Sequence, residues 1–309
     1  MNFIRIDTNE PPDGAKAFEF KTDDGAHLRG AHFPLDGAKG TFLILPGWSE
    51  FIEKYFETVK DLHARGYACA MMDWRGQGMS GRLLADTRRS HIDSIETYKN
   101  DLSSFFDRAV APSLPGPYYL LAHSMGGLPS LLMLSEGDVR FRAAAFSAPL
   151  TKLKGHPVQE VVFRAIASGL GIFGATGLPV KMPKDDAPVF EADALTSDLT
   201  RFQVFADLQA ADPSACVRAP TFGWVQAVLN GSDALHTDGR INGVKIPTLI
   251  ASAEHDDLVV SDDHAALATQ NENIEHLFIA EARHEILMES DHLRDQFFNA
   301  LDNLIKRAG

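Results

Sequence analysis

The residues best suited to chemistry surround Ser124. They form the run Ala122-His123-Ser124-Met125-Gly126-Gly127, between an expected strand and an expected helix. A serine on such a sharp turn is exposed as a nucleophile, and its strained backbone requires small residues two positions before and two positions after it. Gly126 meets this requirement, and Ala122 adds only one methyl group. The backbone N–H of Met125 is expected at the start of the helix, where it would stabilise a developing oxyanion.

A glycine-rich turn without catalytic function would have a similar sequence, so the partners of the serine decide between the two interpretations. The expected strand Thr248–Ala251 leads to Asp256 and Asp257, and the expected strand His276–Ile279 leads to His284. A carboxylate that orients an imidazole allows the imidazole to take the proton of a serine. The order serine, acid and histidine, each on a loop after a strand, therefore predicts nucleophilic catalysis. At this point either aspartate can be the acid.

Two other uses of the histidines are less well supported. His123 precedes Ser124, but adjacent strand residues point to opposite faces, so His123 is not expected to be the base. Several possible metal ligands also cluster near the acid loop, but they lack a recognised spacing such as H-E-x-x-H, and a single strand–loop–helix segment cannot bring all of them together. The residues of this cluster are His255, Asp256, Asp257, Asp262, Asp263 and His264. We expect neither a metal nor an organic cofactor.

Short apolar runs that alternate with helical patterns must position these residues, and this alternation is typical of an α/β protein. Between about residues 149 and 239 the pattern changes to helical segments broken by glycine and proline. The sequence thus predicts one α/β core formed by residues 1–148 and 240–309, with a helical insertion over residues 149–239. Outside this insertion, further strands are expected at Thr41–Leu45, Ala68–Met72, Tyr118–Ala122 and Ala143–Ser147.

The composition excludes several classes of function. The chain has 309 residues, 45% of them hydrophobic, which is enough for a large core. A net charge of -13 argues against binding to nucleic acid or to anionic membranes. The two cysteines, Cys69 and Cys216, do not form a disulfide framework, and neither a signal peptide nor a membrane anchor is expected. We therefore expect a cytoplasmic protein.

Four segments resemble the lysophospholipase and monoglyceride-lipase branch of the α/β hydrolases, above all the bacterial lysophospholipase L2 type. Pro46–Glu50 with Glu53–Tyr55 resembles the H-G-x-x-E…Y segment of that family, and Asp73–Gly81 resembles its D-x-R-G-x-G-x-S-G loop. His123–Gly127 resembles the nucleophile turn, and His284–Glu289 resembles the segment of the base. This resemblance implies an α/β-hydrolase fold, in which helices flank a mostly parallel central sheet and a helical cap is inserted.

The resemblance also implies a role for individual residues. Ser124 would be the nucleophile and His284 the base. The D-x-x-V pattern of the family aligns with Asp257-Leu258-Val259-Val260 and makes Asp257 the acid, although Asp256 fits the same pattern one residue earlier. The residue after the family's H-G supplies the second oxyanion N–H, which here is Trp48, beside that of Met125. Pro46 stands where the family has histidine, which leaves this backbone donor in place.

The expected function is hydrolysis of a carboxylic ester of a monoacyl lipid, either a lysophospholipid or a monoacylglycerol, through an acyl-enzyme. The expected partner is this small lipid substrate. The alternatives are a short-chain carboxylesterase, a thioesterase or, from another class, a non-catalytic binding protein with the same fold. The cap is rich in apolar residues that either line an acyl-chain pocket or pack the core of the cap itself. Among them are Phe163, Ile166, Leu170, Ile172, Phe173, Phe202, Phe205, Phe222 and Trp224.

Overall fold

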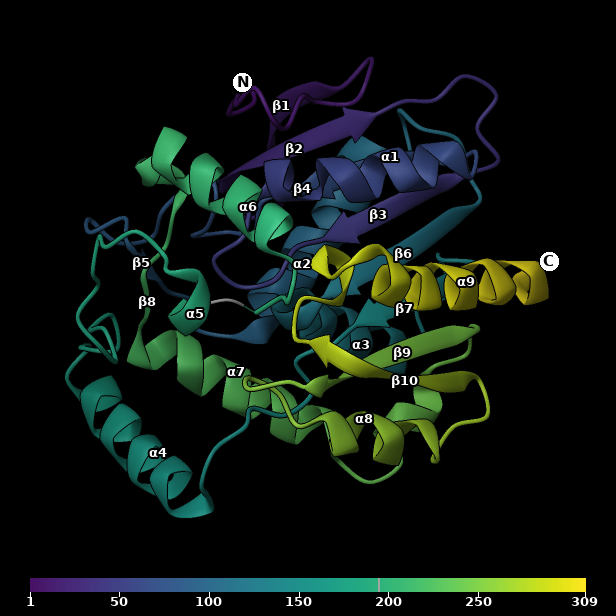
Figure 1. The fold of residues 1–309 in the computed structure, drawn as a ribbon. Coiled ribbons are helices and arrows are strands. Elements are labelled where there is room, and N and C mark those ends of the chain that lie inside the picture. Colours follow the sequence, from purple (N-terminus) through teal and green to yellow (C-terminus); the bar gives the residue numbers. More distant parts are fainter. Residues whose placement is uncertain (194) are drawn as a thin grey trace.

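A computed structural model of the chain describes residues 1–193 and 195–309 and centres on an eight-stranded sheet (Figure 1). The strand order is β1-β2-β4-β3-β6-β7-β9-β10. In this order, the six strands β4, β3, β6, β7, β9 and β10 are parallel to one another. Strand β2 is antiparallel to both β1 and β4. The expected mostly parallel sheet is confirmed. The strands are Lys16–Lys21 (β1), His27–Phe33 (β2), Thr41–Leu45 (β3), Ala68–Met72 (β4), Tyr118–His123 (β6), Ala143–Ser147 (β7), Thr248–His255 (β9) and Ile274–Arg283 (β10).

Helices cover both faces of the sheet, because both faces of the parallel strands are apolar. In β3, the side chains of Leu43 and Leu45 pack into one core cluster, and those of Phe42 and Ile44 pack into another on the opposite face. The first cluster includes residues of α2, α3, α7 and α8, and the second includes residues of α1 and α9. These helices are Phe56–Ala64 (α1), Ile95–Phe105 (α2), Gly127–Ser135 (α3), Phe222–Leu235 (α7), Ser261–Ala268 (α8) and Asp291–Ala308 (α9).

The expected insertion over residues 149–239 is divided between the cap and the core. Helices α4 (Pro157–Ile172), α5 (Phe190–Asp193) and α6 (Leu199–Ala211) lie outside the two main core clusters (Figure 1). In contrast, Trp224 and Val228 of α7 are buried in the same cluster as α2 and α3. Helix α7, which falls inside the expected insertion, thus packs in a layer of the core, and the division of the chain at residues 149 and 239 stays a prediction. The short strands Arg89–Ser90 (β5) and Ala219–Pro220 (β8) pair in parallel just before α7.

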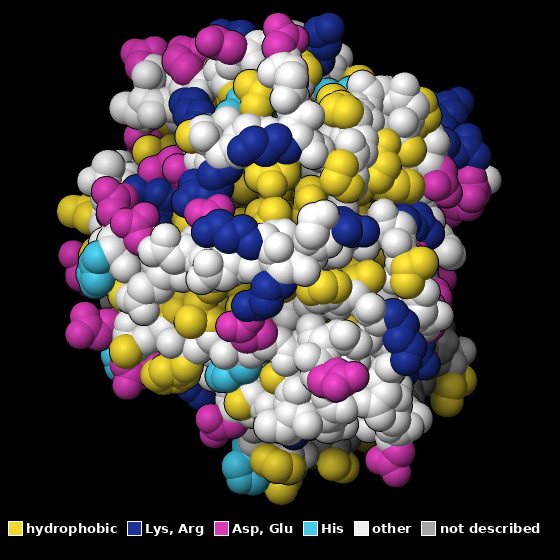
Figure 2. Space-filling model, turned by 90° about the vertical axis from the view of Figure 1, so that its right-hand side faces the viewer, with side chains coloured by type: hydrophobic (Ala, Val, Ile, Leu, Met, Phe, Trp, Pro, Cys, Tyr) yellow, Lys and Arg dark blue, Asp and Glu magenta, His cyan; other side chains and the backbone are white. Residues whose placement is uncertain are grey.

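The cap differs from the core in how little of its surface it buries. Ala167 is the buried residue of α4, whereas Ile172 and Phe173 at the end of this helix have relative exposed areas of 83% and 84%. Within the described residues, no helix combines the length and the apolar character needed to cross a membrane. On the face shown in Figure 2, charged side chains are interspersed with hydrophobic ones, and several hydrophobic side chains gather near the centre of its upper half.

Candidate active site

Ser124 follows β6 directly and lies on the turn that leads into α3. Its φ angle is 48°, in the left-handed region that a non-glycine residue adopts only under strain. Gly126 lies so close to the end of β3 that an added Cβ would be 2.7 Å from the carbonyl oxygen of Pro46 and 2.8 Å from that of Leu45. The small residue expected two positions after Ser124 is thus required by close contact with a neighbouring loop.

This contact predicts the effect of Gly126→Ala. The φ angle of Gly126 is -59°, which alanine adopts readily, so the effect would be steric. We expect a loss of about 1–3 kcal/mol in the free energy of unfolding, because backbone atoms must move, together with lower activity. The matched control is Gly169→Ala in α4, where an added Cβ meets no atom within 4 Å. Urea unfolding and ester hydrolysis measure both effects, and a Gly126→Ala protein as stable and active as the control would contradict this account.

The imidazole of His284 lies between Ser124 and Asp256. Its Nε2 is 2.8 Å from Oγ of Ser124, and its Nδ1 is 2.7 Å from Oδ2 of Asp256. A carboxylate only accepts hydrogen bonds, so Nδ1 carries the ring proton and Nε2 accepts the hydrogen of the serine hydroxyl. The three side chains are buried, and Ser124 has a relative exposed area of only 7%. Such an array can deprotonate the serine and turn it into a nucleophile.

The structure differs from the sequence-based prediction of the acid by one residue. The side chain of Asp257 is 73% exposed and does not contact His284. In contrast, Oδ1 of Asp256 accepts the backbone N–H groups of Leu258 and Val259 at 2.8 and 2.9 Å, which directs Oδ2 toward His284. Burial raises the pKa of Asp256, but its hydrogen bonds and the charge of His284 outweigh this effect and lower the pKa. The structure therefore brings Asp256 to His284, and not Asp257 as expected.

The two expected oxyanion donors lie on loops that meet next to Ser124. Strands β3 and β6 are parallel neighbours with Leu45 opposite Ala122, so the loops that follow them emerge together. In the described part of the chain, the backbone N–H of Trp48 has no hydrogen-bond acceptor. Met125 immediately follows Ser124 in the first helical turn. Their function as oxyanion donors stays a prediction, and the geometry leaves the N–H of Trp48 free for it.

The segment that resembles the D-x-R-G-x-G-x-S-G loop holds the loop of Trp48 in place. The indole Nε1 of Trp74 donates to the carbonyl oxygen of Pro46 at 2.8 Å. The side-chain oxygen of Gln77 accepts the backbone N–H of Ser49 at 2.6 Å, and its Nε2 lies 3.2 Å from Sδ of Met125. Gln77 thus connects the two loops that carry the expected oxyanion donors.

His123 is buried next to this array but is bonded elsewhere, as expected from its position in the strand. Its Nδ1 donates to the carbonyl oxygen of Ser147 at 2.9 Å, and its ring centroid is 5.0 Å from that of His284. Burial lowers the pKa of His123 to about 4; the charge of Glu50 opposes this shift, and those of His284 and Lys54 add to it. His123 is therefore neutral at neutral pH and does not contact the serine hydroxyl.

A charged cluster beside the Trp48 loop, with two buried members and one partly exposed member, was not identified from the sequence. It consists of Glu50, Lys54 and Glu285, and Nζ of Lys54 lies 2.5 Å from Glu50 and 2.6 Å from Glu285. Burial raises the pKa of Glu50, but the charge of Lys54 and its hydrogen bonds lower this pKa to about 2. Burial lowers the pKa of Lys54, but the two carboxylates raise it above its usual value. The spacing of Glu50 and Lys54 was a signal for an ion pair, whereas Glu285 is far away in the sequence.

The base loop, residues 284–289, is hydrogen bonded to the cap. The backbone N–H of Glu285 donates to the carbonyl oxygen of Leu195 at 2.8 Å. The carboxylate of Glu289, which is fully buried, accepts the backbone N–H of Ser197 at 3.0 Å. These bonds fix residues 195–197 of the cap on the loop that carries His284.

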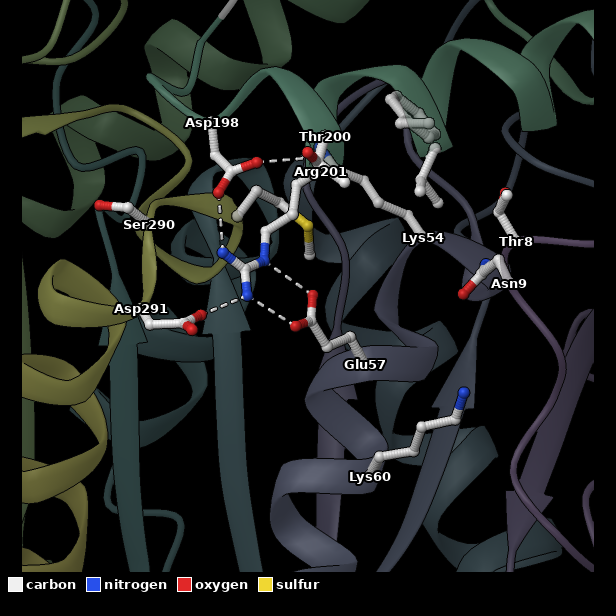
Figure 3. A pocket seen from close by; sticks show the side chains of 13 residues that line it. Thr8, Asn9, Lys54, Glu57, Lys60, Asp198, Thr200, Arg201, Ser290 and Asp291 are labelled. Carbon is white, nitrogen blue, oxygen red and sulfur yellow. Dashed lines mark hydrogen bonds and ion pairs between the residues drawn. The ribbon is translucent and has the colours of Figure 1, made fainter.

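A cavity of about 580 Å³ lies next to the base loop, between α6, α1 and the N-terminal segment (Figure 3). Arg201 of α6 forms ion pairs there with Glu57, Asp198 and Asp291 at 2.7, 3.0 and 2.6 Å. Lys54 lines this cavity, but none of the three residues of the Ser–His–Asp array does. The cavity is thus a neighbour of the candidate active site and not the place where the serine would react.

The apolar residues of the expected insertion have different surroundings. Phe163 of α4 stacks on Phe222 with ring centroids 5.2 Å apart, which is packing within the cap and its junction with α7. In contrast, Trp224 lies with its ring centroid 5.8 Å from that of Trp48, on the loop next to Ser124. Three of the residues are exposed on the surface: Ile166, Ile172 and Phe173.

Comparison with known families gives the class of the protein. The profile of the family described as serine aminopeptidase, S33, matches residues 36–291. The chain belongs to this family. It is an α/β-hydrolase and an enzyme of the serine hydrolase class, as the resemblance implied.

Individual proteins and solved structures are also similar to this chain. Lysophospholipase L2 of Escherichia coli (strain K12) is 30% identical over 306 residues, which cover 94% of this chain and 87% of that protein. The probable lysophospholipase L2 of Haemophilus influenzae is 27% identical over 278 residues, with 88% and 85% covered. A soluble variant of monoglyceride lipase from Saccharomyces cerevisiae, in complex with a substrate analogue, has a TM-score of 0.73 at 19% identity, with 96% and 97% covered. This hydrolase is thus similar to lysophospholipases in sequence and to a monoglyceride lipase in fold.

Proposed function

We propose that Ser124, His284 and Asp256 form a catalytic triad that hydrolyses the carboxylic ester of a monoacyl lipid, a lysophospholipid or a monoacylglycerol. The observation that carries the proposal is the relay of hydrogen bonds from Asp256 through His284 to Ser124, at 2.7 and 2.8 Å. The left-handed backbone of Ser124 supports it, because strain of this kind is found at functional sites.

The mechanism follows from the position of each group. His284 accepts the proton of Ser124 as Oγ attacks the ester carbonyl, and Asp256 stabilises the imidazolium that forms. The backbone N–H groups of Trp48 and Met125 donate hydrogen bonds to the oxyanion. The alcohol leaves with the proton from His284, and water then hydrolyses the acyl-enzyme by the same route. No step needs a metal or an organic cofactor.

The substrate class rests on the relatives and on the cap. Two relatives, 30% and 27% identical to this chain, are named lysophospholipase L2 and probable lysophospholipase L2. In this chain, apolar side chains such as Ile172 and Phe173 are exposed at the end of cap helix α4, and Trp224 of α7 packs beside Trp48 on the loop next to Ser124. An apolar surface of this kind suits an acyl chain, because each methylene that it buries contributes about 0.8 kcal/mol.

A chain-length series tests the substrate class. We expect kcat/KM to increase by roughly tenfold for every two carbons added to the acyl chain, until the pocket is full. The series consists of p-nitrophenyl esters, monoacylglycerols and lysophospholipids, each measured below its critical micelle concentration. An aminoacyl p-nitroanilide is added as a control, because the family is described by its aminopeptidases.

Two results would contradict the proposed substrate. A flat profile, or a maximum at acetate or butyrate, would indicate a short-chain carboxylesterase whose cap closes the site instead of lining an acyl pocket. Cleavage of the anilide in preference to every ester would indicate a peptidase.

A further inference from the structure

Lys54 joins the two loops that carry the proposed catalytic groups. It lies in a single helical turn, Ile52–Tyr55, with a side chain that is only 2% exposed. Its ammonium is shared between Glu50, on the loop of Trp48, and Glu285, on the base loop. The centroid of the Phe205 ring, from the cap, lies 4.5 Å from Nζ of Lys54.

The contact with Glu50 bears on the loop of Trp48. The second carboxylate oxygen of Glu50 accepts the backbone N–H of Gly47 at 2.5 Å and the hydroxyl of Tyr55 at 2.6 Å. Gly47 directly precedes Trp48, so this hydrogen bond orients the chain that presents the Trp48 N–H. The fit is close, because a Cβ added to Gly47 would lie 2.9 Å from the same oxygen.

The contact with Glu285 bears on the catalytic base. Glu285 follows His284 in the chain, and its carboxylate is 2.6 Å from Nζ of Lys54. The backbone N–H of Glu285 is held by Leu195 of the cap, so the ion pair with Lys54 links this residue to the core. The base therefore has a side-chain link to the loop of Trp48 that does not run through Ser124.

Stability alone does not account for this cluster. One ammonium faces two carboxylates in a buried place, and burying ion pairs costs desolvation that apolar packing avoids. Effective acyl transfer needs the base and the oxyanion donors at fixed positions relative to the serine. The cluster joins the two loops that carry these groups, so it can hold them in place.

We propose that Lys54 is a positioning residue, which holds the Trp48 loop and the His284 loop in register through its ion pairs with Glu50 and Glu285. This proposal rests on the proposed function, because it concerns how the two loops of that same site are positioned. The side chain of Lys54 is only 2% exposed and both its ion pairs are with loop residues, so in a positioning role its loss should lower kcat and leave KM nearly unchanged.

The test compares Lys54→Met, Lys54→Arg and a matched control. We expect Lys54→Met to lower kcat by about 10- to 100-fold per active site, because small displacements of catalytic groups have effects of this size. Lys54→Arg should recover much of kcat, since a guanidinium can also hold two carboxylates. The control is Lys99→Met, because Lys99 also bridges two carboxylates, Glu96 at 2.9 Å and Glu136 at 2.6 Å, on the far side of α2. It should keep the wild-type kcat.

Glu285→Gln gives a second test, which keeps Lys54 and so does not depend on whether the Lys54→Met variant folds. It leaves Lys54 paired with Glu50 alone and removes a negative charge from a cluster that has an excess of one, so the protein should fold. We expect kcat to fall by about three- to tenfold with KM unchanged, and we expect no further loss when Glu285→Gln is added to Lys54→Met, because both remove the same link.

Active sites are counted by titration with a fluorophosphonate, so that kcat refers to folded, reactive protein. Wild-type kcat per titrated site in both Lys54→Met and Glu285→Gln, or fully additive effects of the two, would overturn the positioning role. A rise in KM with unchanged kcat would also overturn it, because the lysine would then act in substrate binding. If the wild-type protein itself does not react with the fluorophosphonate, the proposed function fails, and this result is distinct from a failure of the inference about Lys54.

Discussion

Replacing Ser124 by alanine should lower kcat for ester hydrolysis by on the order of 10⁵- to 10⁶-fold, because the hydroxyl is the attacking group and no neighbour can replace it. The activity that is left would come from binding and from the oxyanion donors. The measurement is hydrolysis of p-nitrophenyl butyrate by the purified variant, together with its labelling by a fluorophosphonate, which reacts with an activated serine.

A control separates loss of chemistry from loss of fold. Ser135 is also buried and lies at the other end of α3, where its hydroxyl donates to the carbonyl oxygen of Leu132. Ser135→Ala should remain active and be labelled as the wild type is, and the circular dichroism of both variants should match the wild type. Near wild-type turnover by Ser124→Ala would refute the proposed function as a whole.

The second large effect is expected for Asp256→Asn. The amide of asparagine can offer an N–H in place of an oxygen to Nδ1 of His284, so the imidazole would take the wrong tautomer and lose its lone pair toward Ser124. We expect kcat to fall by about 10⁴-fold, the size seen when this hydrogen bond is changed in other triads. Steady-state kinetics over a range of pH would measure the change.

Asp257→Asn is the matched control at the adjacent position. The carboxylate of Asp257 is 73% exposed and lies 3.8 Å from Nζ of Lys154, itself 55% exposed, so the pair contributes little. Its replacement should leave kcat within about twofold of the wild type, as is usual for an exposed ion pair. If Asp257→Asn were the more damaging change, the acid loop in solution would have the register implied by the family pattern and not that of the structure.

The sequence predicted the parts of this fold that depend on local pattern. Strands β3, β4 and β7 have the expected bounds, because each is a run of buried residues ended by a turn. The turn at Ser124 was also predictable, since the need for small neighbours is a steric property of the turn itself. Strands β1 and β2 were not predicted. β1 is an edge strand that buries only Phe20, so it lacks the continuous apolar run by which the central strands were recognised.

The sequence could not decide between Asp256 and Asp257 as the partner of His284, because the end of the preceding strand could not be placed. The expected strand stops at Ala251, whereas β9 continues to His255, with Glu254 and His255 exposed. Without that end, the sequence does not distinguish Asp256 from Asp257, because both fit the D-x-x-V pattern. The choice is made by two backbone N–H groups that hold one oxygen of Asp256, which is tertiary detail of the loop.

The Glu50–Lys54–Glu285 cluster and the packing of α7 could not be predicted for a different reason. Both depend on contacts between segments far apart in the chain, such as Lys54 with Glu285, or Trp224 of α7 with the cluster that includes α2 and α3. Helical periodicity predicts that α7 is a helix but does not say which layer it joins. A single sequence has no signal for such pairs unless a motif already assigns a role to each member.

The uneven anchoring of the cap has a consequence for how a substrate enters. Hydrogen bonds tie residues 195–197 to the base loop, and Arg201 fixes α6 to the helices below, whereas Ala167 is the buried residue of α4. The free energy of local opening should therefore be low for α4 and high for α6. We therefore expect α4 to open locally more often than α6, so that a substrate would enter on the α4 side of the cap while the loop of His284 keeps its contacts with residues 195–197.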